Sequence, residues 1–189
     1  MKKILCTLLM GVTFSTLTVT NTKAATKNTV SVAGYTQENS YYDGPAAVKN
    51  VVQKINGSSL SQTGFANSMG TNSSAGTYVD KVSAELRYRT GFNYVTQSIY
   101  ANITLSSAVV YAIDSGYIPI YSVDTKTLNS NYSFSSGHYV VGTGYDYGTS
   151  STVQSVQYYD VYGPMSGYKW ISLTKMENAI KAHAGLYVW

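Results

Sequence analysis

The stretch GHYVVGTGYD, residues 137–146, opens with a Gly-His pair and continues as an apolar run that is typical of a β-strand. A second strand is predicted at residues 153–162, and the Gly-, Ser- and Thr-rich sequence between the two favours a turn. The two segments are therefore predicted to form an antiparallel pair. Further strands are expected at residues 92–99, 118–123 and 168–172. Because the middle one of these contains Pro119, it is expected near an edge of the sheet.

Apolar residues at helical spacing come before this strand-rich part of the chain. The clearest helix runs from Pro45 to Ile55, because proline is favoured in a first helical turn and Asn56-Gly57 is a typical stop. Helices are also expected at residues 59–69, 79–90, 105–114 and 173–180, with a polar loop at 127–137. Helices that come first and strands that come later indicate an α+β fold, with N-terminal helices packed on a C-terminal antiparallel sheet.

The composition is that of a folded globular domain. Of the 189 residues, 44% are hydrophobic and 12% are charged, which excludes a disordered chain and a coiled coil. No linker, charge block or internal repeat divides the sequence, so we expect a single domain at residues 35–189. Residues 25–34 are expected to lead into this domain, either as an unstructured segment or as a first edge strand.

The first 24 residues have the pattern of a secretory signal peptide. Lys2 and Lys3 form a basic start, an apolar stretch follows, and Thr22-Lys23-Ala24 places small residues at the positions that determine cleavage. A membrane anchor is the alternative, but Ser and Thr residues interrupt the stretch, and a spanning helix needs about 20 apolar residues. We therefore expect cleavage after Ala24 and a secreted protein, extracellular or associated with the cell wall, that is free of the membrane afterwards.

Removal of the leader changes the charge and the chemistry available to the chain. It takes away three of the 13 Lys and Arg residues, which leaves a net charge of +1, and a nucleic-acid partner is therefore not expected. It also takes away Cys6, the one cysteine of the sequence, so that no thiol, disulfide or thiolate metal site remains. The rest of the sequence has no paired metal-ligand spacing and no phosphate-binding glycine loop, so no metal or cofactor is expected.

Three segments carry the features of a catalytic site: QENSYYDGPAAV at residues 37–48, GHYVVGTGYD at 137–146 and VQYYDVYGP at 156–164. In this order and at this spacing they resemble the peptidase C39-like family, papain-like cysteine peptidases that process bacteriocin leaders. In that family a Gln lies six residues before a Cys-Gly-Pro-Ala segment, a Gly-His pair heads a later strand, and an Asp or Asn follows on the next strand. The resemblance covers residues 33–189 and implies a papain-like fold.

The resemblance also assigns a role to four residues. Asp43 stands where the family has its nucleophilic cysteine, His138 where a histidine takes the thiol proton, and Asp160 where an acid orients that histidine. Gln37, six residues before Asp43, stands at the position that donates to the oxyanion. In the family, the dipole of the first long helix favours the thiolate at its N-terminus. One departure is Val161, which follows Asp160 where a proline is usual.

The other departure removes the chemistry of the family, because Asp43 replaces the cysteine. A carboxylate is a poor nucleophile toward a peptide carbonyl, since the mixed anhydride that it would form is itself highly reactive. We therefore interpret the chain as a secreted pseudo-peptidase that binds a peptide or a cell-surface ligand without cutting it. The alternatives are a non-thiol hydrolase in which Asp43 and His138 activate water, a cysteine peptidase whose nucleophile was substituted, and a transglutaminase-like or other papain-related binding module.

Each candidate residue also has an ordinary structural role open to it. Asp43 is expected to act as the N-cap of the first helix, whether or not it has a second role. His138 would be a surface histidine or a hydrogen-bonded histidine of the core, Asp160 a buried turn anchor and Gln37 a loop residue. His183, the other histidine of the chain, is expected to be an exposed helix residue.

Overall fold

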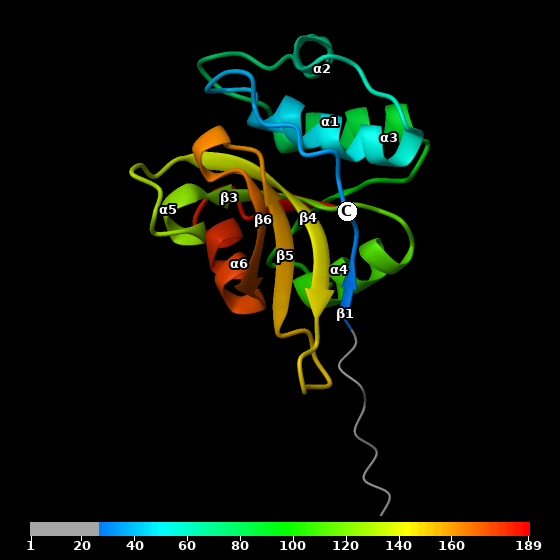
Figure 1. Ribbon diagram of the computed structural model, residues 1–189, viewed down its shortest axis with the longest axis vertical. Helices are drawn as coiled ribbons and strands as arrows, with labels where there is room; N and C mark the ends of the chain where they lie inside the picture. Colours follow the sequence, from blue (N-terminus) through cyan, green and yellow to red (C-terminus); the bar gives the residue numbers. More distant parts are fainter. Residues whose placement is uncertain (1–26) are drawn as a thin grey trace, which may run out of the picture.

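The computed structural model describes residues 27–189, and the expected leader at residues 1–24 lies outside the described part of the chain. Helices α1 to α6 occupy Asp43–Asn56, Gln62–Met69, Val79–Thr90, Leu105–Asp114, Thr125–Leu128 and Leu173–Lys181 (Figure 1). Strands β1 to β7 occupy Lys27–Thr29, Thr96–Ser98, Ile120–Asp124, Gly137–Asp146, Ser155–Asp160, Gly167–Ser172 and Leu186–Val188. Among residues 27–189, no helix is long and apolar enough to cross a membrane.

The strands form one antiparallel sheet in the order β2-β7-β3-β4-β5-β6, which confirms the predicted α+β fold. The longest strand, β4, pairs with β5 along most of its length, as the sequence predicts, and with β3 along its first half. Strand β1 pairs with the end of β4, so of the two expectations for residues 25–34 the strand is the one observed for Lys27–Thr29. The register places Val140 of β4 opposite Asp160 of β5, and this brings two of the candidate segments together.

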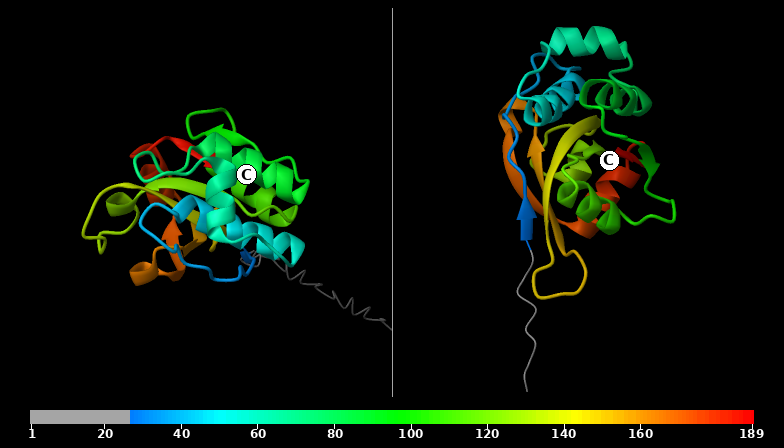
Figure 2. Two further views of the ribbon diagram at one scale, coloured as in Figure 1. Left: turned by 90° about the horizontal axis from the view of Figure 1, so that it is seen from above. Right: turned by 90° about the vertical axis from the view of Figure 1, so that its right-hand side faces the viewer.

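Helices cover both faces of the sheet (Figure 2). Helices α1, α2 and α3 pack on one face, where Tyr139 and Val141 of β4 share their apolar core. Helices α4 and α6 pack on the other face, where Val140 and Tyr145 of the same strand join a second core. Because successive side chains of a strand point to opposite faces, β4 contributes to both cores. The candidate residues lie where this central strand meets the N-terminus of α1 (Figure 1).

The N-terminal half of α1 is held by close packing and by one buried amide. Gly44, in the first turn, lies against the loop that precedes α3, and a Cβ at this position would overlap the side chain of Thr77. The buried side chain of Asn50 accepts hydrogen bonds from the backbone N–H groups of Gly34 and Tyr35 and donates one to the Tyr35 carbonyl. The segment before α1 is therefore bound to the side of the helix through Asn50, and the first turn is held against Thr77.

Two of the strand predictions were wrong in detail. The strand expected at residues 92–99 is reduced to the short β2, because the backbone turns at Tyr94, whose N–H donates to the carbonyl of Phe92 at 2.9 Å. The strand expected near an edge is central, since β3 lies between β7 and β4. Pro119 precedes the first residue of β3, so it removes no N–H from the ladder, and its carbonyl accepts from the Gly142 N–H at 2.7 Å.

Helix capping explains the smaller differences. Helix α2 begins three residues later than expected, because the Ser61 hydroxyl accepts a hydrogen bond from the Gly64 N–H and caps the helix there. The loop expected at residues 127–137 begins inside a short helix, α5, which the sequence did not indicate. Asp124 caps α5 by accepting from both the N–H and the hydroxyl of Thr127. The predicted strand at 153–162 is limited to β5.

Candidate active site

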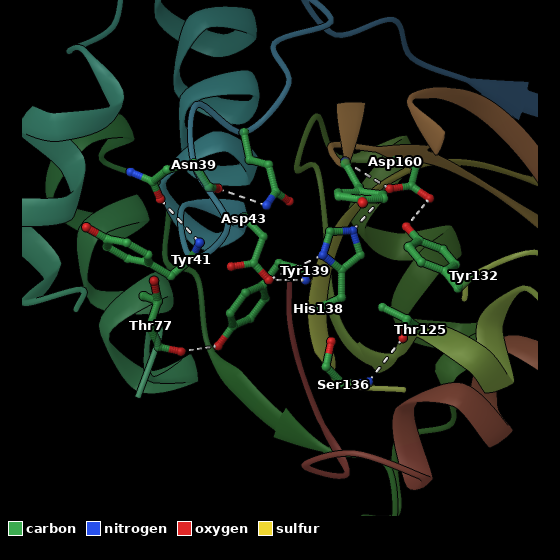
Figure 3. A network of polar contacts seen from close by, with 12 residues as sticks. Asn39, Tyr41, Asp43, Thr77, Thr125, Tyr132, Ser136, His138, Tyr139 and Asp160 are labelled. Carbon is green, nitrogen blue, oxygen red and sulfur yellow. Dashed lines mark hydrogen bonds and ion pairs between the residues drawn. The ribbon is translucent and has the colours of Figure 1, made fainter. Parts of the chain in front are cut away.

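Three of the four sequence-predicted site residues come together in the structure, although they are far apart in the chain. Asp43 is the first residue of α1, His138 is the second residue of β4, and Asp160 is the last residue of β5. Figure 3 shows the imidazole of His138 lying between the two carboxylates. The first helix supplies one carboxylate, and the sheet supplies the histidine and the second carboxylate. In a papain-like site the residues are divided between a helix and a sheet in the same way.

Each nitrogen of the His138 ring faces one carboxylate. Nδ1 lies 3.3 Å from Oδ2 of Asp43, and Nε2 lies 3.0 Å from Oδ1 of Asp160. The histidine is 5% exposed. A neutral imidazole carries one N–H, whereas an imidazolium carries two and can donate to both carboxylates at once. The geometry therefore favours the protonated ring.

The electrostatic environment of His138 acts in the same direction. Burial on its own lowers the pKa of this histidine, but the hydrogen bonds to Asp160 and Asp43 and the two negative charges outweigh it and raise the pKa from 6.5 to about 9. The ring is therefore a cation at neutral pH. A protonated imidazole holds a carboxylate in place but cannot accept a proton from a nucleophile.

Asp160 is fully buried and is held on several sides. Besides His138, it accepts a hydrogen bond from the Tyr132 hydroxyl at 2.7 Å and one from the Tyr162 backbone N–H at 3.1 Å. The ammonium group of Lys169 lies 3.8 Å from its Oδ2. Burial raises the pKa of Asp160, but the hydrogen bonds and the charge of His138 outweigh it and hold the pKa below its usual range. This carboxylate is built to remain ionised and to orient the histidine.

The carboxylate of Asp43 binds groups of the sheet and does not cap its own helix. Its Oδ2 accepts from the backbone N–H of Tyr139 at 3.0 Å in addition to facing His138 (Figure 3). The expected N-cap role was wrong: the residue at the N-cap is Tyr42, and no side chain caps α1. The reason is geometric, since Asp43 is already inside the first turn. Its carboxylate therefore occupies the place of a nucleophile at a helix N-terminus, as the resemblance implies.

Gln37 lies at the same cleft, but its amide is engaged differently from an oxyanion donor. Its Nε2 donates to the backbone carbonyl of Asn39 at 2.9 Å, and its Oε1 is buried without a hydrogen-bond partner among residues 27–189. One of the two amide N–H groups that could stabilise an oxyanion is thus directed at the protein itself. The role of Gln37 in catalysis stays a prediction.

A cleft runs past the Asp43–His138 pair and consists of two adjoining hollows. One has a volume of about 260 Å³ and the other about 290 Å³. Both are lined by Ser40, Asp43, Ser136, Gly137 and His138. In the first hollow the remaining lining residues are Gln37, Phe134 and Tyr162. In the second they are Tyr41, Ala75, Gly76, Thr77, Tyr139 and His183.

Two residues of this site were missed from the sequence. His183 is exposed, as expected, but it lies in the turn after α6 and not in a helix. It lines the second hollow, and its ring lies so close to Gly137 that a Cβ there would overlap it. The glycine before His138 was the available signal for this contact. Tyr132, which lies in the predicted polar loop, is buried and supports Asp160. No sequence pattern distinguishes it from the other 18 tyrosines of the chain.

A bound metal ion needs several ligand side chains that converge on one point. Among residues 27–189, no three His, Asp or Glu side chains are grouped so that they could hold a metal ion. The pair of carboxylates is separated by the imidazole, with one carboxylate on each of its nitrogens. What the site provides is an oriented imidazolium, a carboxylate at the helix N-terminus and a cleft beside them.

Two of the solved structures similar to this chain are a peptidase domain and a C39-like peptidase. The peptidase domain of Streptococcus ComA, a bifunctional ABC transporter of a quorum-sensing pathway, matches with a TM-score of 0.54 at 20% identity, over 82% of this chain and 95% of that one. A structure described as a C39-like peptidase from Bacillus anthracis matches with a TM-score of 0.60 at 14% identity, over 86% and 96%. At these identities the likeness shows the fold, which is papain-like. A search among curated proteins finds no match.

The sequence itself matches the model of one protein family over most of its length. That match covers residues 29–186, which include the first helix, the sheet and all four candidate residues. It agrees with the order of the three sequence segments and with the fold, and it favours this family over the transglutaminase-like alternative. The chain therefore belongs to the Peptidase_C39 like family.

Proposed function

We propose that this protein is a secreted pseudo-peptidase, which holds a peptide segment in the cleft of a peptidase fold without cleaving it. The single observation that carries the proposal is the state of Asp43 and His138. The carboxylate at the nucleophile position is bonded to the imidazole, and both ring nitrogens face carboxylates. The site therefore contains neither a thiolate nor a free base.

Cleavage by the family mechanism needs a thiol at residue 43. Cys6 is the one cysteine of the chain, and the part of the sequence that forms the domain has none. Oδ2 of Asp43 is held by His138 and by the Tyr139 N–H, so an attack on a peptide carbonyl would fall to Oδ1, a weak carboxylate nucleophile. The tetrahedral adduct would expel the carboxylate, which is the better leaving group, faster than it expelled the amine, so that the peptide bond would re-form. These points support a loss of peptidase activity.

Binding can outlast catalysis because the cleft does not depend on the nucleophile. The hollows of about 260 and 290 Å³ are lined by residues of several segments, among them the segment before α1, the loop before α3 and the start of β4. Asp160 and its partners still hold His138 in place. A peptide segment is the ligand that an elongated cleft of this fold would accept, and pockets with a few convergent polar groups are common ligand sites.

The second candidate is a non-thiol hydrolase in which Asp43 and His138 activate water. A general base must be deprotonated at the working pH, whereas the pKa of His138 is raised to about 9 by its two carboxylate neighbours. Asp43 would have to be the base, and its Oδ2 is already bonded to Tyr139 and His138. The third candidate, a substituted cysteine peptidase, is favoured by the intact Asp160–His138 pair and is tested by restoring the thiol.

The experiment restores the nucleophile as Asp43→Cys in a Cys6→Ser background, so that the new thiol is the only one. Its rate of alkylation by iodoacetamide at about pH 6–7 should exceed that of a free thiol by roughly tenfold or more, because His138 and the helix dipole favour the thiolate. The matched control is Ser40→Cys in the same background. Ser40 lines both hollows, and the ring nitrogens of His138 face Asp43 and Asp160 and not Ser40. A thiol at residue 40 should therefore react at the ordinary rate.

The unmodified protein is tested with the same peptides that the restored variant cleaves. It should bind them, seen as NMR shift changes at Asp43, His138 and Ser136, and release no new amine. Hydrolysis by the unmodified protein that disappears in both Asp43→Asn and His138→Gln would overturn the proposal in favour of the second candidate. Equal thiol rates in the Asp43→Cys and Ser40→Cys variants would show that no latent catalytic pair exists.

Secretion is part of the proposal and rests on the leader sequence. A basic start, an apolar stretch and Thr22-Lys23-Ala24 support export and cleavage after Ala24. N-terminal sequencing of protein recovered from the culture medium should therefore begin at Ala25. Recovery of the Met1 end in a membrane fraction would contradict this expectation.

A further inference from the structure

The first hollow of the cleft, of about 260 Å³, combines an aromatic wall with oxygen acceptors. Phe134 is 39% exposed and meets Tyr162 edge to face, with ring centroids 5.6 Å apart. Tyr132 packs on both rings, at 5.4 and 5.6 Å, and fixes them from behind. Asp43 and Gln37 line the same hollow. The volume is below the roughly 300–1,000 Å³ of pockets that hold a complete small ligand, so it suits one side chain.

The charges around this hollow favour a cation. Asp43 places a carboxylate in the lining, and its Oδ1 accepts no hydrogen bond within residues 27–189. The positive ring of His138 directs its two nitrogens at Asp43 and Asp160 and offers no donor to a ligand. No lysine or arginine of the described chain lines the hollow; Lys169 lies on the far side of Asp160 from the imidazole, 3.8 Å from Oδ2.

We infer that this hollow is a subsite for the basic side chain, Lys or Arg, of a bound peptide. The ammonium or guanidinium group meets the open oxygen of Asp43, and the stem lies along the faces of Phe134 and Tyr162. An acidic side chain would face the carboxylate of Asp43, and the cation beside it, His138, already directs both of its N–H groups at carboxylates. The inference rests on the proposed function, because it names the residue class that the cleft selects in its peptide ligand.

The replacement of cysteine by aspartate is what creates this preference. A cysteine at residue 43 would have one sulfur, which is either neutral or, as a thiolate, paired with His138. The carboxylate of Asp43 has two oxygens and bonds His138 through only one of them. The second oxygen is therefore available to a ligand. The residue that removes catalysis would thus supply the specificity of binding.

The experiment measures the affinity of the protein for four blocked pentapeptides, Ac-Gly-Gly-X-Gly-Gly-NH₂, with Lys, Arg, norleucine or Glu as X. Lys and Arg should bind about tenfold more tightly than norleucine, and Glu more weakly than norleucine. A fifth peptide, with norleucine as X and a free N-terminus, separates a side-chain cation from a terminal amine. If it alone gains affinity, the cation recognised is the peptide terminus, and the side-chain assignment is overturned.

Two variants test the residues, and one serves as a control. Asp43→Asn should make Lys and norleucine peptides bind equally, and Phe134→Leu should reduce the preference for Lys about threefold. Glu177→Gln on α6, which removes one negative charge away from the cleft, should leave the preference unchanged. Peptides that all bind with the same affinity would overturn the subsite and leave the proposed function standing. If no peptide binds, including norleucine, the proposed function itself fails.

Discussion

The two carboxylates beside His138 are built in different ways. Asp160 is fully buried and receives the Tyr132 hydroxyl, the Tyr162 backbone N–H and the histidine, whereas the side chain of Asp43 is 13% exposed and lines a cleft. The inner carboxylate is part of the core of the fold. The outer one stands at its surface, at the position where a nucleophile belongs. A peptidase fold can therefore lose its reactive group on the outer side while the inner side keeps the histidine oriented.

The largest loss in the free energy of unfolding is expected when the inner carboxylate, Asp160, is removed. Asp160→Ala leaves the buried imidazolium and the Tyr132 hydroxyl without an acceptor, and removal of one partner from a buried ion pair costs about 3–5 kcal/mol of the free energy of unfolding. Urea denaturation followed by circular dichroism at about pH 6 measures this. Asp160→Asn, which keeps an acceptor, should cost less. A loss no larger than that of Asp43→Ala would remove the distinction between the two sides.

The second effect is the pH dependence that both carboxylates give to His138. Its pKa is raised from 6.5 to about 9 in the folded protein, so the resulting stability is fully present below pH 6.5 and is lost as the pH rises through 9. The shift corresponds to at most about 3 kcal/mol. The free energy of unfolding should fall between pH 6 and 9.5, and it should fall much less in His138→Gln. An NMR titration of the ring that gave a midpoint near 6.5 would contradict the pairing.

The third effect isolates the outer side. Asp43→Ala removes one acceptor from the imidazole and one from the Tyr139 N–H, but the cleft allows water to replace it. We expect a loss of about 1–2 kcal/mol in the free energy of unfolding, smaller than for Asp160→Ala, and a lower pKa for His138. The same urea and NMR measurements check both. A loss of more than about 3 kcal/mol would show that Asp43 belongs to the core as much as Asp160 does.

The sequence was sufficient for the fold class and for the elements that carry the candidate residues. The helix from residue 45 and the paired strands at 137–146 and 153–162 have local signals, namely proline, glycine and apolar spacing. The central position of β3 could not be predicted, because Pro119 fixes only its own N–H and not the neighbours that the strand finds on each side. Strand order depends on packing between distant segments.

The candidate site shows the same limit at the level of side chains. The order of three segments indicated that Asp43, His138 and Asp160 meet, but not that Asp43 turns away from its own helix N-terminus. That orientation depends on the Tyr139 N–H, 96 residues away in sequence. The hydrogen bond from the Tyr132 hydroxyl to Asp160 joins residues that are 28 positions apart in the sequence and includes a loop residue, and no local sequence pattern indicates it. Contacts of this kind appear only once the chain is folded.

The smallest predicted effect concerns the rim of the outer side, where His183 lies against Gly137. The backbone of Gly137 is that of an ordinary strand residue, so Gly137→Ala brings no backbone strain, and its cost comes from the new methyl group meeting the imidazole. Because His183 is exposed, its ring can move, and we expect a loss of about 0.5–1 kcal/mol.

His183→Ala alone should change the free energy of unfolding very little. In the double variant the loss should disappear, since the methyl group then meets open space. A double-mutant cycle by urea denaturation measures this coupling. If the loss persists in the double variant, in which the imidazole of residue 183 is absent, Gly137 is required by the strand itself. His183 would then not constrain residue 137 at the cleft.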